Sequence, residues 1–440
     1  MLCVELLTVL KQLLTDQRFQ ATYRLAPHAF TRIRKLPFER VLLAVCRLTR
    51  LALQGCLNAF FKALGESQHV ATASALCQAR QKLHFGAFRA LHRASITLFY
   101  REQTNHSLVQ TWQGHRLTAT DCTFLNLPNT PETRAGYIIQ QNKSANERVQ
   151  AMASCWYDVL NGLPLNFEVT SNRVEKQAVF TSHAAYWQPG DIHIYDRAYA
   201  DYSVIAYHAH GNHHFVIRCP TGSSFRVVRE FLTSPEVDRT VILGVGKRVK
   251  AWVQTKGLPQ CVPVRLLKIL LPTGETEVLL TSLLDASQYA HEAFSELYCF
   301  RWGVETYFDA FKHQLDVERF NSEKLNGILQ EIYAMVFLSA LSRLLSLPAE
   351  VDLQQRSPPT KRPRKYRHKL NQVVVYATVS LFLAELFLLP SNSLIQRLQE
   401  LWHMIQQTSI PIRPNRSFPR PRLKTRQQLR YLRYKKRLWA

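Results

Sequence analysis

Four polar side chains within residues 298–312 are spaced so that a helix would gather them along one edge. At about 100° per residue, Arg301, Glu305 and Lys312 all fall within about 60° of Tyr298. An apolar stripe lies directly beside that edge, formed by Leu297, Phe300, Val304, Phe308, Phe311 and Leu315. The pattern predicts a half-buried helix at the rim of a cleft, with both cations facing outward. An ordinary amphipathic helix with ion pairs worth a few tenths of a kcal/mol explains the same spacing.

Two further carboxylates occupy predicted strands far from this helix in the sequence. Asp121 lies inside a strand over residues 115–125, and Asp196 follows a short strand over residues 191–195. Ligand sites in open α/β sheets gather at strand ends. Together with Glu305 these acids could hold two hard divalent cations, which activate a water or a 3′ hydroxyl. Because the chain has 32 acids, the spacing alone does not single out this triple.

The spacing Tyr298-x2-Arg301-x3-Glu305-x6-Lys312 matches a known signature, YREK, so the chain resembles the DDE transposases of the insertion-sequence-four type. The resemblance covers about residues 70–345. Residues 196–199, DRAY, resemble the DRGY of that family around its second aspartate. The run TATDCTFLNLP resembles its first-aspartate strand, and ATASALCQARQKL resembles its N-terminal region more loosely. Ala198 replaces the usual glycine, which matters only where φ is positive.

The resemblance implies three catalytic, metal-binding residues, namely Asp121, Asp196 and Glu305. They would bind two Mg²⁺ ions, with Mn²⁺ expected to substitute. It also implies contacts with DNA by Tyr298, Arg301, Lys312 and Arg197. Trp302 borders the same edge and is proposed to stack on an unpaired or flipped base, although a structural tryptophan is an equal alternative.

The implied activity is cut-and-paste transposition, which is metal-dependent DNA hydrolysis followed by transesterification. The partners would be double-stranded DNA, as terminal inverted repeats and as target, and a second copy of the chain in a homodimer. Two alternatives are a catalytically inactive or domesticated DNA-binding relative and a structure-specific nuclease on the same fold. The complete triad and YREK signature argue against decay but do not prove turnover.

The expected fold class is α/β, with an RNase H-like core interrupted by an all-β insertion. A hairpin is predicted around Asn161-Gly162. The alternating helices and strands that follow it suggest a partly parallel sheet. The next segment is predicted to contain strands only, the first over residues 225–231. The fragment Gly244-Val245-Gly246-Lys247 is discounted as a phosphate loop because its spacing does not match GxxxxGK(S/T) and no helix is expected after it. The expected division is a helical DNA-binding domain (1–105), the first part of the core (106–219), the β insertion (220–288), the second part of the core with the Glu305 helix (289–350), and a basic linker, helices and tail (351–440).

The charge of the chain predicts a polyanionic partner. Lys and Arg number 56 against 32 Asp and Glu, giving +24, so nucleic acid is the first candidate and an anionic membrane the second. In the N-terminal region Arg80, Lys82, His84 and Arg89 could contact phosphates or form a solvated face. Residues 413–437 carry eleven basic residues, which favours a phosphate-binding arm over a solvated tail.

The remaining signals bear on where the protein works. Nine scattered cysteines without CxxC indicate a reduced compartment rather than a disulfide framework or a zinc site. No signal peptide is evident, and the apolar segment over residues 373–389 contains Glu385, which favours a buried helix over a membrane span. We therefore expect a bacterial cytoplasmic, nucleoid-associated protein with no membrane partner.

Overall fold

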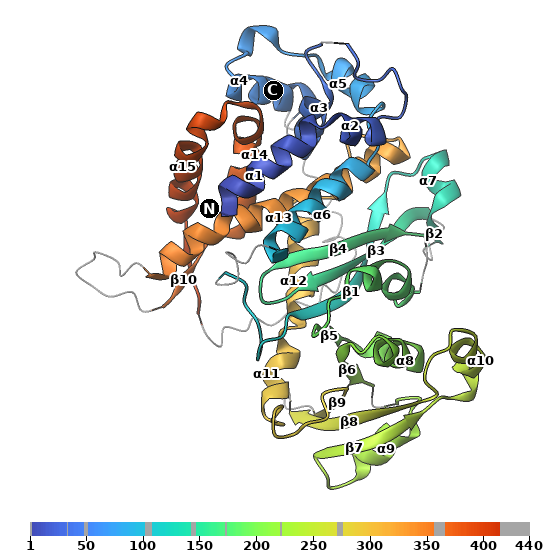
Figure 1. Ribbon diagram of the computed structural model, residues 1–440. Coiled ribbons are helices and arrows are strands. Elements are labelled where there is room, and N and C mark those ends of the chain that lie inside the picture. The colour runs from blue at the N-terminus through green and yellow to red at the C-terminus, as the bar shows by residue number, and fades with distance from the viewer. Residues whose placement is uncertain are drawn as a thin grey trace, which may run out of the picture.

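The fold is taken from a computed structural model, shown in Figure 1, that describes most of the chain. The described residues are 2–32, 34–47, 52–101, 108–141, 147–171, 174–220, 222–270, 276–355 and 366–413. The basic tail proposed as a phosphate-binding arm therefore lies almost entirely outside the described residues. So does most of the proline-broken basic stretch at residues 356–369.

The N-terminal region is helical, as its apolar periodicity predicts. Its α-helices are α1 (Leu2–Thr15), α2 (Gln17–Tyr23), α3 (Phe38–Cys46), α4 (Leu53–Ala63), α5 (Ala73–Arg80) and α6 (Gly86–Arg101). Helix α1 buries one face, which carries Leu2, Cys3, Leu6, Leu7, Leu10 and Leu14. Asp16 and Thr72 cap α2 and α5 by accepting backbone N–H bonds. These helices pack on the later helices α13 and α14, so the N-terminal helices and these later helices share one helical layer.

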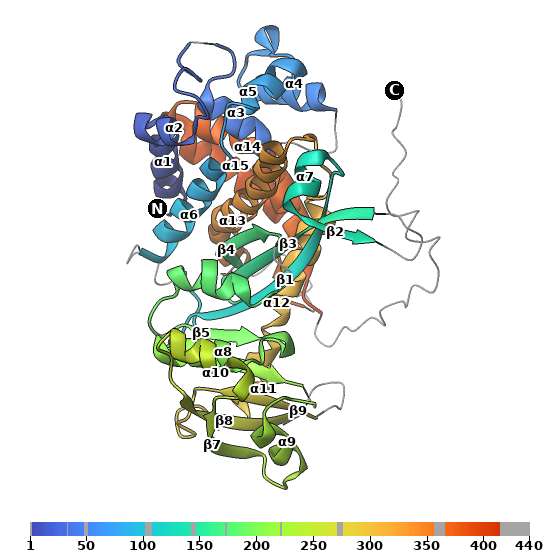
Figure 2. The same ribbon diagram turned by 90° about the vertical axis from the view of Figure 1, so that its right-hand side faces the viewer.

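A single mixed sheet of nine strands runs through the protein below this helical layer (Figures 1 and 2). Its strands are β1 (Leu117–Leu127), β2 (Ile138–Gln141), β3 (Glu147–Asp158), β4 (Leu163–Thr170), β5 (Ile192–Tyr195), β6 (His214–Cys219), β7 (Asp238–Gly244), β8 (Cys261–Leu270) and β9 (Thr276–Thr281). The order is β2-β3-β1-β5-β6-β9-β8-β7, with β4 also paired to β3. The ladders β1–β5 and β5–β6 are parallel and the others antiparallel, which confirms the prediction of a partly parallel sheet.

Short connections carry the chain between the strands of this sheet. The predicted hairpin is present, because Gly162 adopts a φ of 70° in the turn between β3 and β4. The strand-to-strand connections contain η3 (Val179–His183), η4 (Ala184–Tyr186), η5 (Arg197–Tyr199) and α8 (Tyr202–His210), and α7 (Pro131–Gly136) precedes β2. Buried side chains of β5 and α8 include Ile192, Ile194, Val204 and Ile205.

The segment predicted to be all-β contains two helices as well as three strands. Residues 226–231, predicted to be strand, lie in α9 (Arg226–Thr233), because Val228 and Phe231 are three apart and are both buried on one helical face. Helix α10 (Lys247–Thr255) directly follows Gly246, so the expectation that no helix follows this glycine is wrong. Strand β9 pairs with β6, which joins this segment to the central sheet rather than leaving it as a separate β unit.

The run over residues 298–312 is helical but is not one uniform α-helix. It is divided into α11 (Ala293–Cys299), α12 (Trp302–Asp309) and the π-helical η6 (Ala310–Gln314). At the first junction the backbone N–H groups of Arg301 and Val304 bond to carbonyls three residues back. This tight turn and the wider π turn change the helical rotation per residue from the roughly 100° of an α-helix. The four polar side chains between Tyr298 and Lys312 therefore do not share the single predicted edge.

Three long helices complete the layer beside the sheet. They are α13 (Leu325–Gln355), α14 (Gln372–Leu388) and α15 (Leu394–Gln406), which pack on one another. A two-stranded ladder joins β10 (His368–Lys369) to β11 (Ile410–Pro411). Among the described residues only α13 is long and apolar enough to cross a membrane, and 89% of its most apolar window is buried inside the protein. Helix α14, the predicted buried helix, also packs in this layer.

Candidate active site

The sheet register brings Asp121 and Asp196 together from separate strands. Parallel pairing matches Leu117 with Ile192 and Ala119 with Ile194. Continuing this register by two residues sets Asp196 level with Asp121, and the alternation of side chains places both on the same face of the sheet. Helix α12, which carries Glu305, contacts β1 and β3. The three acids predicted from sequence therefore converge on one region.

Burial and neighbouring charges both act on the carboxylate of Asp121. Its Oδ1 accepts a hydrogen bond from the backbone N–H of Cys122 at 2.8 Å. Burial, with a smaller contribution from the charges of Asp196 and Glu305, raises the pKa of Asp121 to about 7, although the Cys122 amide and Arg301 act to lower it. An acid held this way is stabilised in its ionised form by an added cation.

Asp196 is fixed by the turn that follows its strand. It is the N-cap of η5, and its Oδ1 accepts from the backbone N–H of Ala198 at 2.8 Å. Ala198 is not among the described residues with positive φ, so alanine is tolerated where the family usually has glycine. Arg197 is exposed beside this carboxylate.

Glu305 is held by an ion pair within the helical run. Arg301 Nη1 lies 2.7 Å from Glu305 Oε1, and the Glu305 side chain is 33% exposed. Arg301 itself is only 4% exposed, so the prediction that it faces outward is wrong. Its guanidinium lies over the rings of Tyr298 and Trp302, at 5.7 and 5.0 Å from their centroids. The carboxylate is therefore oriented by a buried cation that also lies over two aromatic rings.

The other residues of the signature differ sharply in exposure. Tyr298 is 2% exposed, and burial raises the pKa of its phenol to about 12. Lys312 is half-buried rather than outward-facing, and its Nζ donates to the carbonyl oxygen of Phe124 in β1 at 2.7 Å. Trp302 is 47% exposed. In this conformation Trp302 presents a surface to a ligand, whereas Tyr298 and Arg301 do not.

The donor set suits a hard divalent cation, although its side chains do not converge closely enough to hold one. Three carboxylates are the oxygen ligands that Mg²⁺ prefers. Among the described residues, no group of three or more His, Cys, Asp or Glu side chains is placed so that it could hold a metal ion. Glu305 is engaged by Arg301, and Asp121 and Asp196 each accept a backbone N–H bond. Completing the site therefore requires movement of these side chains.

A fourth acid, Glu175, lies close to this group and escaped the sequence analysis. Burial raises its pKa, and the charge of Asp196 adds to the effect. Its carbonyl oxygen lies 4.0 Å from the Sγ of Cys122, the neighbour of Asp121. Glu175 belongs to none of the sequence motifs around the three predicted acids. Its position near them is apparent only from the packing of its segment against β1.

Comparisons with known proteins find similarity along most of the chain. A family model described as "Transposase DDE domain" matches residues 112–341. The chain is similar to the transposase InsG for insertion sequence element IS4 of Escherichia coli (strain K12), with 24% identity over 409 residues, covering 88% of this chain and 86% of that protein. It also aligns with a piggyBac transposase synaptic complex with hairpin DNA, at 9% identity and a TM-score of 0.46, covering 90% of this chain and 85% of the other.

Proposed function

The chain belongs to the transposase DDE domain family, and from that premise we propose that it excises an insertion sequence and joins it to target DNA by cut-and-paste transposition. The observation that carries the proposal is the parallel β1–β5 register, which when continued by two residues sets Asp196 level with Asp121, in strands close to α12 and Glu305. One carboxylate within a strand, a second just past the end of the adjacent parallel strand and a third on a neighbouring helix suit phosphodiester chemistry. The DNA substrate would place the protein at the nucleoid of a bacterial cytoplasm.

The proposed roles follow from the geometry of each residue. Asp121, Asp196 and Glu305 would hold two Mg²⁺ ions, which supply Lewis acidity and activate a water or a 3′ hydroxyl. Arg301 holds the Glu305 carboxylate in an ion pair, and the proposed metal site would require that carboxylate to turn toward the two aspartates. Lys312 ties the Glu305 segment to β1 through the Phe124 carbonyl. Contact with DNA by Lys312, or by the buried Tyr298 and Arg301, would require this packing to open.

The strand order supports an RNase H-like core as part of the proposal. Strands β4, β3 and β1 form an antiparallel unit, and β5 and β6 continue it in parallel. We extend the proposal to the expected division of the chain, with residues 220–288 as a mixed insertion between the strands and the Glu305 helix. Terminal inverted repeats would be bound by a homodimer, whose mass with end DNA can be measured by light scattering.

Conservative substitutions of the three acids test the proposal. Asp121→Asn, Asp196→Asn and Glu305→Gln should each abolish Mg²⁺-dependent cleavage of DNA carrying the element's ends, while end binding in a gel-shift assay stays near the wild-type level. Asp309→Asn is a matched control, because this acid lies on the same run with a side chain 71% exposed. Retained cleavage in the three variants, or equal loss in the control, would overturn the assignment.

Metal binding can be measured without any reaction. Mg²⁺ at ten times its dissociation constant should stabilise the native protein by about 1.4 kcal/mol, seen as a rise in Tm. Asp121→Asn and Asp196→Asn should lose this rise, and Asp309→Asn should keep it. A rise that is the same in all four proteins would place the metal elsewhere.

The two alternative functions differ in what the wild type does. A DNA-binding relative without activity would bind end DNA and leave it intact at all Mg²⁺ and Mn²⁺ concentrations. A structure-specific nuclease would cut branched DNA regardless of end sequence and would not join a 3′ hydroxyl to a second duplex. Strand transfer of a pre-cut end into plasmid DNA therefore separates transposition from both.

A further inference from the structure

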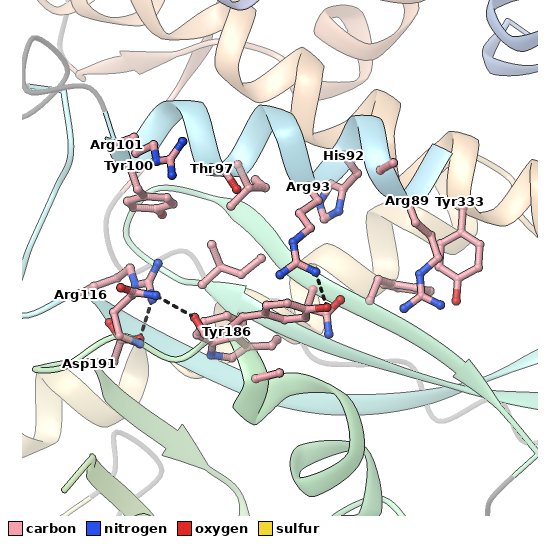
Figure 3. Close-up of a pocket in the computed structure, with 18 of the residues that line it drawn as sticks. Arg89, His92, Arg93, Thr97, Tyr100, Arg101, Arg116, Tyr186, Asp191 and Tyr333 are labelled. Carbon is pink, nitrogen blue, oxygen red and sulfur yellow. Dashed lines mark hydrogen bonds and ion pairs between the residues drawn. The ribbon is translucent and has the colours of Figure 1, made fainter. Parts of the chain in front are cut away.

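A cavity of about 1130 Å³ lies between α6 and the segment that leads into β5 (Figure 3). One wall is helix α6, and the other is formed by residues 185–191. The floor comes from β3 and β4 and includes Trp156, Leu165 and Asn166. None of the three acids of the candidate active site lines it.

The floor of this cavity lies on the other face of the sheet from the candidate active site. In the β1–β3 ladder Asp121 is paired with Cys155, and Thr120 is paired with Trp156. Neighbouring residues of a strand point to opposite faces, so Trp156 and Asp121 project in opposite directions. A ligand in the cavity would therefore not be the phosphodiester held at Asp121 in the same molecule.

Cations are repeated along the wall formed by α6. Arg89, Arg93 and Arg101 are spaced by four and eight residues, with Thr97 completing the series, and all four line the cavity. Successive members rise by about 6 Å along the helix axis. Figure 3 shows them in a row along α6, with Arg116 on the facing side. Such a row can follow a chain of phosphates.

Two of these cations are neutralised and two are not. Arg89 pairs with Glu168 at 2.9 Å, and Arg116 pairs with Asp191 at 2.5 Å. Among the described residues no carboxylate pairs with Arg93 or Arg101, and both are exposed. Of the described residues that line the cavity, Asp191 is the only acid, and Arg116 already occupies it. The cavity therefore carries a net positive charge.

Aromatic rings face these cations from both walls. The Arg93 guanidinium lies 3.8 Å from the centroid of the Tyr186 ring and donates to its hydroxyl at 2.5 Å. Tyr100 and Trp156 hold Arg116 between them, at 4.9 and 5.1 Å. Tyr186 is half-buried, and the ring face that Arg93 now covers would become available to a base if the guanidinium turned to a phosphate.

We propose that this cavity is a second nucleic-acid site that binds single-stranded DNA, with backbone phosphates on Arg93 and Arg101 and a base stacked on Tyr186. A positive groove with interleaved aromatic rings is the usual form of single-strand recognition. The cavity is slightly larger than the roughly 300–1,000 Å³ of sites for small ligands, which suits a few nucleotides. A duplex keeps its bases paired and offers no free base to Tyr186. The site goes beyond the proposed transposase chemistry, because it does not use the three acids.

The test measures binding of a fluorescein-labelled (dT)6 oligonucleotide to the full chain by fluorescence anisotropy. The double variant Arg93→Ala/Arg101→Ala should weaken binding at least about tenfold. The slope of log affinity against log salt concentration should become shallower by about 1.4. Tyr186→Leu should weaken binding by about five- to 150-fold with the slope unchanged. Arg226→Ala is the matched control, since Arg226 is an exposed arginine in α9, outside the cavity.

A second measurement does not depend on how the variants fold. Photo-crosslinking of a hexamer that carries 5-iodouracil, followed by peptide mass mapping, should label wild-type peptides within residues 86–101 or 185–191. Labels found only elsewhere would overturn the proposal, as would variants that bind (dT)6 like Arg226→Ala. Asp121→Asn should bind the hexamer normally, so failure of this site and failure of the proposed catalytic function are distinguished.

Discussion

The guanidinium of Arg301 lies 2.7 Å from the carboxylate of Glu305, one helical turn away, and only the carboxylate reaches solvent. This pair changes the meaning of the signature spacing. The cation that the spacing places on an outer edge is buried, and in the proposed function it would act on DNA chemistry through Glu305. Orientation of one carboxylate by a fixed guanidinium is more specific than a point charge, because the planar group presents several donors.

Arg301→Ala should therefore lower both stability and cleavage. Loss of a charge-assisted hydrogen bond with a buried partner should reduce the free energy of unfolding by about 1–3 kcal/mol. Cleavage should fall further than the unfolded fraction explains, because Glu305 loses its orientation. Urea unfolding and cleavage of end DNA measure the two effects. Arg301→Lys should restore stability more than cleavage, and equal recovery of both would contradict an orienting role.

Trp302→Ala should weaken the DNA complex while leaving the fold almost unchanged. The ring is 47% exposed, which favours a surface role over a place in the core. Base stacking on an aromatic ring contributes about 1–3 kcal/mol, so the affinity for end DNA should drop measurably. Anisotropy titrations and thermal unfolding provide the comparison, with Trp302→Phe retaining most of the affinity. A large fall in Tm without loss of affinity would show a structural tryptophan.

Arg80→Met should damage the fold rather than DNA binding. Arg80 is buried, donating to Gln330, Glu331 and the Gly327 carbonyl in α13 at 2.8–3.0 Å, so it does not contact phosphates. Its removal leaves the buried Glu331 without its cation, at a cost of about 3–5 kcal/mol. Lys82→Ala, on an exposed neighbour, should stay within about 0.5 kcal/mol in the same urea titration. Equal effects of the two substitutions would contradict this assignment.

Stability should fall as the pH drops below about 6.5. Burial lowers the pKa of His92 to about 4 and that of His183 to about 3. Below about pH 6.5 these histidines bind protons in the unfolded chain, whereas the buried imidazoles of the folded chain stay neutral. The stability that each histidine contributes is therefore complete above that pH and is lost as the pH falls toward the folded pKa. At pH 5 each of these two histidines should lower the free energy of unfolding by about 2 kcal/mol.

Urea unfolding at pH 7 and at pH 5 measures this loss. His183→Gln should reduce the pH dependence, because glutamine can still bond to Ser154 and Asn166, which now contact the two ring nitrogens, without titrating. His210→Gln, a change at an exposed end of α8, should leave the dependence unchanged. An unaltered slope in His183→Gln would show that His183 is not a source of the acid sensitivity.

Local patterns in the sequence determined much of the secondary structure and the net charge of this protein. Strand patterns predicted that Asp121 lies within a strand and that Asp196 follows one, the Asn161-Gly162 pair identified the hairpin, and the spacing from Tyr298 to Lys312 identified the helical run. These signals are reliable because each depends on neighbours a few residues away. The excess of 24 positive charges likewise needs no structure to indicate a polyanionic partner.

Only the tertiary structure decided which of these side chains are buried and which meet. The junction at Arg301 turned a single predicted edge into a buried cation and a half-exposed acid, and helices α9 and α10 replaced expected β structure. The cavity on α6 needs β3, β4 and residues 185–191 to close it. Burial and convergence depend on segments far apart in the chain, because the same local pattern can pack in several ways until its partners are in place.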